Sequence, residues 1–189
     1  MIKHLLLGCT GSVGVLGVPW LIADLRREYG TEVQVLMTAS AQKFITPYSL
    51  ELLTGRPVAV DVFERNFQNH ITYLEGHTVF LIAPASANTI SKIANGIADN
   101  IVSLCACVCL GSKSKLIMAP AMNPAMWKNP LVRENVQKLA SKGAYFVDPT
   151  AGVEISNFKK EMTAMANNET IIQKILEIET DVRRKVRRK

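Results

Sequence analysis

Residues 115–127 read KLIMAPAMNPAMW, an apolar run followed by a segment rich in proline and methionine. The apolar run, 115–119, is typical of a strand buried in a parallel sheet. Asn129 and Pro130 then form a helix-start signal, with an amide at the N-cap and proline at the first helical position. Residues 120–127 are therefore predicted to be a strand-to-helix loop, the place where open α/β sheets bind ligands. Composition alone favours a loop with a purely structural role. Whether the loop binds a ligand therefore has to be judged from the rest of the chain.

Strand and helix patterns alternate on both sides of this segment. Strands are expected at 2–7, 32–38, 57–63, 78–83, 115–119 and 145–148. Helices are expected at 15–30, 41–45, 46–55, 90–99, 130–142 and 169–179, whereas 100–110 suits an apolar helix or a strand-like segment. This alternation predicts a parallel, doubly wound α/β sheet. The chain has 189 residues, enough for a single domain with a real core, which is predicted to span residues 1–180.

The composition is that of a soluble globular protein, with 48% hydrophobic and 20% charged residues. No apolar run reaches the roughly 18 residues that a membrane span requires, and no signal peptide is recognised before the first strand. We therefore expect a cytoplasmic protein with no membrane partner.

Neither the net charge nor the cysteines indicate a nucleic-acid or metal partner. The net charge is +6, but residues 183–189 alone carry six Lys or Arg side chains, so the remainder is near neutral. Residues 181–189 are predicted to be a solvated basic C-terminal tail. The four cysteines, Cys9, Cys105, Cys107 and Cys109, lack the spacing of zinc ligands and are expected to be buried thiols.

The first predicted strand runs into a loop of small residues, GCTGSVG at 8–14. Glycines allow the backbone to approach an anion, and the start of the following helix attracts phosphate. The spacing differs from the dinucleotide fingerprint, and the second strand ends at Thr38 rather than at an acidic residue that would hold a ribose. By itself this loop is a weak signal for phosphate.

Three loops are expected at the same edge of the sheet, at 8–14, 84–89 and 120–127. All three are rich in small or amide side chains rather than in acids, bases or metal ligands. Such a set suits an uncharged planar cofactor that carries a phosphate, and it does not suit hydrolysis. No metal is expected.

Two of these loops resemble the paired signatures of the homo-oligomeric flavin-containing cysteine decarboxylases. They are PASANT at 84–89 and PAMNPAMW at 120–127. The segment 69–71, Asn-His-Ile, resembles the histidine motif of this family, and 10–13, Thr-Gly-Ser-Val, resembles its flavin-phosphate motif. The spacing of Thr38, Ala41 and Phe44 matches the second-strand motif, and the resemblance covers about residues 1–148.

The resemblance implies a flavodoxin-like, Rossmann-like three-layer sandwich that binds FMN between the subunits of a trimer. Such trimers often assemble into dodecamers, so a homotrimer or homododecamer is expected. FAD stays open as the cofactor, because the first loop does not distinguish the two flavins.

The resemblance also implies roles for individual residues. His70 is expected to be the acid/base, which suits an imidazole with an unperturbed pKa of about 6.5. Asn123 is expected to hold the substrate carboxylate, whereas His4 and His77 are expected to be structural. The expected cofactor-binding residues are Thr10, Gly11, Ser12, Thr38, Phe44, Pro84, Ser86, Ala87, Asn88, Thr89, Met122 and Met126.

The lack of one cysteine indicates which branch of the family the chain resembles. Phosphopantothenoylcysteine decarboxylases resemble one another in a cysteine after the last strand, which reduces the enethiol intermediate. Here 150–155 reads TAGVEI, and no cysteine follows Cys109. The expected reaction is therefore oxidative decarboxylation of the C-terminal cysteine of a precursor peptide to an aminoenethiol, toward an aminovinyl-cysteine ring in a lantibiotic-like peptide.

Residues 150–162 are expected to form a mobile clamp over that peptide. Two alternatives stay open. The first is phosphopantothenoylcysteine decarboxylation in coenzyme A biosynthesis, and the second is a non-catalytic regulatory flavoprotein.

Overall fold

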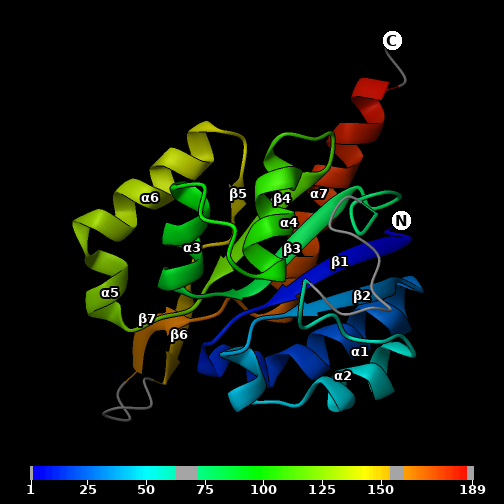
Figure 1. Cartoon of the computed structure of the whole chain (residues 1–189), viewed down its shortest axis with the longest axis horizontal. Helices are drawn as coiled ribbons and strands as arrows, with labels where there is room; N and C mark the ends of the chain where they lie inside the picture. The colour runs from blue at the N-terminus through cyan, green and yellow to red at the C-terminus, as the bar shows by residue number, and fades with distance from the viewer. Residues whose placement is uncertain (1, 63–71, 154–159, 187–189) are drawn as a thin grey trace.

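A parallel five-stranded sheet forms the centre of the molecule (Figure 1). The computed structural model describes residues 2–62, 72–153 and 160–186. The strands are β1 (His4–Cys9), β2 (Glu32–Met37), β3 (Val79–Ala85), β4 (Lys115–Pro120) and β5 (Tyr145–Phe146). Their order is β2-β1-β3-β4-β5, and every pair is parallel. This is the flavodoxin-like order, so the predicted fold class is confirmed.

Helices cover both faces of the sheet and make it the middle of three layers (Figure 1). α1, α2 and α7 contribute to the core on one face, and α3, α4 and α6 on the other. The helical elements are η1 (Val13–Gly17), α1 (Val18–Tyr29), η2 (Ala41–Lys43), α2 (Pro47–Thr54), α3 (Ala87–Ala94), α4 (Ile101–Leu110), α5 (Pro124–Lys128), α6 (Pro130–Ser141) and α7 (Asn168–Val186).

Alternation along the strands divides the core between the two faces. Leu5 and Leu7 belong to the cluster that packs on α1 and α7, whereas Leu6 and Phe80 belong to the cluster that packs on α4. Successive side chains of a strand point to opposite faces, so both must be apolar when both faces are covered. All seven residues of β3 are accordingly buried.

Local signals at the helix ends formed as the sequence predicts. Gly30 and Gly55 end α1 and α2 in the left-handed region, with φ of 62° and 68°. Asn129 caps α6, where its side-chain oxygen accepts a 2.9 Å hydrogen bond from the backbone N–H of Leu131. These caps satisfy groups that a helix end otherwise leaves unpaired.

Three predicted elements differ from the structure. The helix expected at 90–99 is α3, which begins at Ala87 and ends at Ala94, so Asp99 lies in the turn before α4. Within the described part of 57–63, only Ala59 bridges to β2, at Leu36, because Pro57 has no N–H with which to continue a ladder. The segment 120–127 contains a short helix, α5, which begins at Pro124 with Asn123 as its N-cap. The ambiguous segment 100–110 is the helix α4.

The C-terminal part is more regular than the sequence indicates. β6 (Thr150–Val153) and β7 (Lys160–Ala164) form an antiparallel pair, which covers most of the predicted clamp, 150–162, and extends two residues beyond it. α7 continues to Val186, so 181–186 of the predicted tail is helical. Arginine and lysine are good helix formers, so this composition is compatible with a longer helix. No helix among residues 2–62, 72–153 and 160–186 combines the length and apolar character needed to cross a membrane.

Candidate active site

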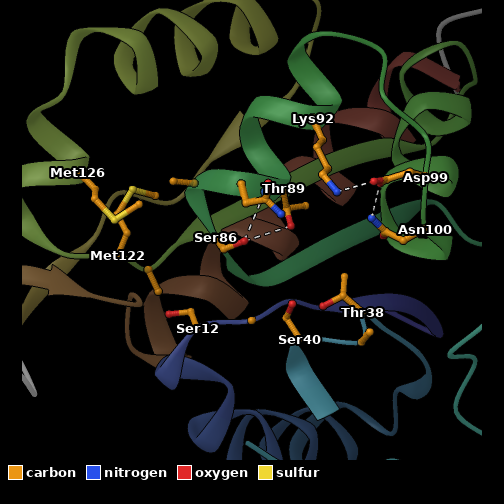
Figure 2. A pocket seen from close by; sticks show the side chains of 15 residues that line it. Ser12, Thr38, Ser40, Ser86, Thr89, Lys92, Asp99, Asn100, Met122 and Met126 are labelled. Carbon is orange, nitrogen blue, oxygen red and sulfur yellow. Dashed lines mark hydrogen bonds and ion pairs between the residues drawn. The ribbon is translucent and has the colours of Figure 1, made fainter. Parts of the chain in front are cut away.

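A cavity of about 410 Å³ lies at the carboxyl edge of the sheet, beyond the neighbouring strands β1 and β3. Figure 2 shows the side chains that line this cavity. The chain after β1 leads to β2 on one side, and the chain after β3 leads to β4 on the other. Doubly wound sheets bind ligands at this switch point. The structure brings together at this cavity the following residues predicted to bind the cofactor: Gly11, Ser12, Thr38, Ser86, Ala87, Asn88, Thr89, Met122 and Met126.

Two further predicted residues, Thr10 and Pro84, lie beneath the cavity and join its loops. The Thr10 side chain is fully buried, and its hydroxyl donates a 2.7 Å hydrogen bond to the backbone oxygen of Pro84. The same hydroxyl accepts a 2.9 Å hydrogen bond from the backbone N–H of Ser86. Thr10 therefore holds the loop after β1 against the loop after β3. Phe44 is not part of the described lining, and its side chain is 45% exposed.

The floor of the cavity depends on a close approach that only glycine permits. A Cβ atom on Gly11 would lie 2.4 Å from the Cβ of Ser40, which follows β2 and also lines the cavity. Ser86 caps α3 by accepting a hydrogen bond from the backbone N–H of Thr89. No acidic residue occupies the first turn of α3. The positive end of this helix dipole therefore meets the cavity, which suits a phosphate.

Met122 and Met126 provide an apolar side of the cavity (Figure 2). Met126 lies on α5 and Met122 immediately before its N-cap. Trp127 fixes α5 against α6, because the guanidinium carbon of Arg133 lies 4.5 Å from its ring centroid. Flexible thioether side chains adapt well to the face of an aromatic ring.

The two predicted catalytic residues are placed differently. Asn123 is exposed, and its side-chain oxygen accepts a 2.8 Å hydrogen bond from the backbone N–H of Ala125. It does not belong to the described cavity lining, although Met122 beside it does. His70 lies outside the described residues. His4 and His77 precede or begin strands at the opposite edge of the sheet, away from the cavity.

The remaining lining residues had not been predicted. They are Ala39, Ser40, Lys92, Asp99, Asn100 and Ala121. The Nζ of Lys92 lies 2.5 Å from one carboxylate oxygen of Asp99, and the Nδ2 of Asn100 donates a 2.9 Å hydrogen bond to the other. The hydrogen bond from Lys92 holds the pKa of Asp99 below its ordinary value. Lys92 follows Thr89 by three residues on one face of α3, a spacing that could have identified it.

None of the four cysteines lines this cavity. Burial raises the pKa of Cys9, Cys105 and Cys109 to about 12, and it also raises the pKa of the half-buried Cys107. Cys9, Cys105 and Cys109 are therefore protonated core residues, as predicted, whereas Cys107 is only half-buried and lies outside the core. Among residues 2–62, 72–153 and 160–186, no group of three or more potential ligands is arranged to hold a metal ion.

Comparison with known proteins identifies the family. The Flavoprotein family model matches residues 1–179. The chain belongs to the Flavoprotein family. It is 37% identical over 183 residues to a probable phosphopantothenoylcysteine decarboxylase of Streptococcus mutans, across 94% of this chain and 99% of that protein. It is 35% identical over 180 residues to the epidermin decarboxylase of Staphylococcus epidermidis, across 93% of this chain and 96% of that protein.

Solved structures agree. A histidine-to-asparagine variant of EpiD in complex with the substrate peptide DSYTC has a TM-score of 0.81 and 32% identity, and the match covers 93% of this chain and 99% of that one. The FMN-dependent cysteine decarboxylase SpaF has a TM-score of 0.76 and 30% identity over 90% and 96% of the two chains. The chain is thus a member of the flavin-dependent cysteine decarboxylases, an enzyme family, as its motifs predicted. Its similar identities to the two curated relatives do not separate the peptide branch from the coenzyme A branch.

Proposed function

We propose that the protein is an FMN-dependent oxidative decarboxylase of a precursor peptide that ends in cysteine. The product would be a C-terminal aminoenethiol, able to close into an aminovinyl-cysteine ring. The observation that carries the choice of branch is the lack of a thiol: residues 110–189 contain no cysteine, and none of the four cysteines lines the cavity. Without a thiol to return electrons to the enethiol, the oxidised product is the end of the reaction.

The residues of the cavity fit FMN. Gly11, Ser12 and the first turn of α3 suit the phosphate, and the two methionines suit the ring system. Ala87 and Ser86 are small enough to let a planar ring lie close to the backbone. When bound, FMN supplies the acceptor for the two electrons that leave the cysteine.

Asn123 and His70 would act on the peptide. The amide of Asn123 has two N–H donors, which suit the substrate carboxylate, and its oxygen is held by the N-terminus of α5. His70 would take the proton from the substrate thiol and return it. Its neighbour Met122 lines the apolar side of the cavity, and this adjacency supports the proposed role of Asn123.

The mass of the product tests this proposal. The probe is the peptide DSYTC, the substrate in the EpiD complex, incubated with the flavin-loaded protein in air. Oxidative decarboxylation removes carbon dioxide and two hydrogens, a loss of about 46 Da. The control peptide, which ends in serine, should keep its mass. An unchanged mass of DSYTC and of other cysteine-terminated peptides would refute the peptide reaction.

The second candidate is phosphopantothenoylcysteine decarboxylation, which the 37% identity to the Streptococcus mutans protein favours. This reaction has no net oxidation, so its product loses only carbon dioxide, about 44 Da. Incubation with phosphopantothenoylcysteine separates the candidates. Formation of phosphopantetheine would assign the chain to the coenzyme A branch, whereas an enethiol product would support the peptide branch.

We also propose that the protein works as a homotrimer or a homododecamer. In the single chain, Leu16, Trp20, Tyr48 and Leu52 are between 53% and 71% exposed. Leu16 and Trp20, in η1 and α1, are four residues apart, as are Tyr48 and Leu52 on α2, and α1 and α2 are in contact. Apolar side chains gathered on neighbouring helices support a surface that another copy of the chain covers. Light scattering after size-exclusion chromatography measures the mass of the assembly. A monomer under conditions that retain flavin would contradict the proposal.

The β6–β7 pair is proposed as the clamp over the peptide. β7 lies beside α5 (Figure 1). Met165, which follows β7, packs against the loop after β1, since a Cβ on Gly14 would lie 3.3 Å from the Cβ of Met165. Protection of residues 150–153 from hydrogen exchange should therefore rise when the peptide binds.

A further inference from the structure

The cavity has three chemically different sides (Figure 2). Met122 and Met126 form an apolar side, and Ser12 and Ser40 provide hydroxyl groups on a second side. The third side is the Lys92–Asp99–Asn100 row, which lies opposite the methionines in Figure 2. These three residues come from α3 and from the turn that leads into α4.

The Lys92–Asp99–Asn100 row presents a donor, an acceptor and a donor in sequence. Lys92 approaches one carboxylate oxygen of Asp99 at 2.5 Å, and Asn100 donates to the other at 2.9 Å. Asn100 is also held in place, because its side-chain oxygen caps α4 by accepting from the backbone N–H of Val102 and of Ser103. The Ser103 hydroxyl also approaches the oxygen that Asn100 contacts, at 3.5 Å. Each carboxylate oxygen has about two acceptor positions, so the oxygen that faces Lys92 can accept another N–H.

The pyrimidine ring of a flavin has the opposite pattern. Its O2 and O4 are acceptors, and the N3–H between them is a donor. We propose that the Lys92–Asp99–Asn100 row recognises the pyrimidine edge of the flavin, with Asp99 accepting from N3–H. This inference rests on the proposed function, which places FMN in the cavity.

The arrangement of the whole cavity supports this orientation. A flavin has an apolar dimethylbenzene end, a polar pyrimidine end and a phosphate on a chain that leaves from the middle of the ring. In the cavity, the methionines, the Lys92–Asp99–Asn100 row and the hydroxyl groups also lie on three different sides. Each side can therefore face the part of the flavin that it suits. If the Lys92–Asp99 ion pair only stabilised the fold, its removal would not change the preference for one flavin over another.

A flavin analogue tests the inference without altering the protein. The probes are FMN and 3-methyl-FMN, in which N3 has no hydrogen to donate, and dissociation constants are measured by quenching of flavin fluorescence. A lost hydrogen bond to a charged group should weaken binding of 3-methyl-FMN at least about tenfold relative to FMN. Equal affinities would overturn the inference. Failure to bind either flavin would instead refute the proposed function.

The variant Asp99→Ala tests whether Asp99 is the residue that distinguishes FMN from 3-methyl-FMN. It should bring the ratio of the two dissociation constants close to one, because no carboxylate remains to distinguish N3–H from a methyl group. The matched control is Glu177→Ala, which removes the carboxylate of an ion pair with Lys174 on α7 and should keep the wild-type ratio. A full preference for FMN in folded Asp99→Ala would show that another group reads N3. If Asp99→Ala does not fold, equal affinities of the wild type for the two flavins would still overturn the inference.

Discussion

Replacement of Gly11 by alanine tests whether the floor of the cavity depends on a close approach between two loops. The new Cβ would lie 2.4 Å from the Cβ of Ser40, and the carbonyl carbon of Ser40 follows at 3.3 Å. Carbon atoms in contact prefer about 3.5–4.0 Å, so one loop has to move by roughly 1 Å. Overpacking of this kind costs about 1–3 kcal/mol. Because both loops line the cavity, much of this cost should appear in flavin affinity, as a loss of about 5- to 150-fold.

A second substitution makes this prediction specific. Ser40→Gly removes the atom that clashes, and the nearest remaining contacts of the new methyl group are 3.3 and 3.5 Å. Flavin affinity is measured by fluorescence quenching for the wild type, the two single variants and the double variant. Gly11→Ala should weaken binding strongly in the wild-type background and by less than about threefold in the Ser40→Gly background. An equal loss in both backgrounds would refute the steric explanation.

Three further predictions concern the histidine, the buried threonine and the thiols. His70→Asn should abolish release of carbon dioxide while flavin remains bound, and retained turnover would remove the imidazole from the mechanism. Thr10→Val should lower the free energy of unfolding by about 1–3 kcal/mol in denaturant titrations, because two buried backbone groups lose their partner; a smaller change would mean that water replaces the hydroxyl. Cys9, Cys105 and Cys109 have pKa values raised to about 12, from 9.0 when unfolded, so the unfolded state loses protons first and stability should fall as the pH rises above about 9. At pH 8 the native protein should show rapid reaction of at most one thiol per chain with Ellman's reagent, that of the half-buried Cys107, and the other three should react only after unfolding. Rapid reaction of more than one thiol in the native protein would contradict the burial of Cys9, Cys105 and Cys109.

Local sequence patterns were sufficient to predict most of the strands and helices. The apolar runs gave the five strands, and residues such as Gly30, Gly55 and Asn129 marked the helix ends, because periodicity and capping depend on neighbours in the chain. The carboxyl ends of parallel strands share one edge, so the motifs could be expected to meet there. The prediction missed α5, although Asn123 and Pro124 repeat the helix-start pattern of Asn129 and Pro130.

Long-range packing determined the rest. The order β2-β1-β3-β4-β5 decides which loops border the cavity, and it depends on how helices cover the two faces of the sheet. Thr10 has the sequence context of a cofactor ligand, yet its hydroxyl lies beneath the cavity and joins two loops separated by 74 residues. The Lys92–Asp99–Asn100 row forms only because the chain turns after α3 and returns to the same cavity. A hydrogen bond or an ion pair between distant segments has no periodicity of its own, so folding had to bring these side chains together.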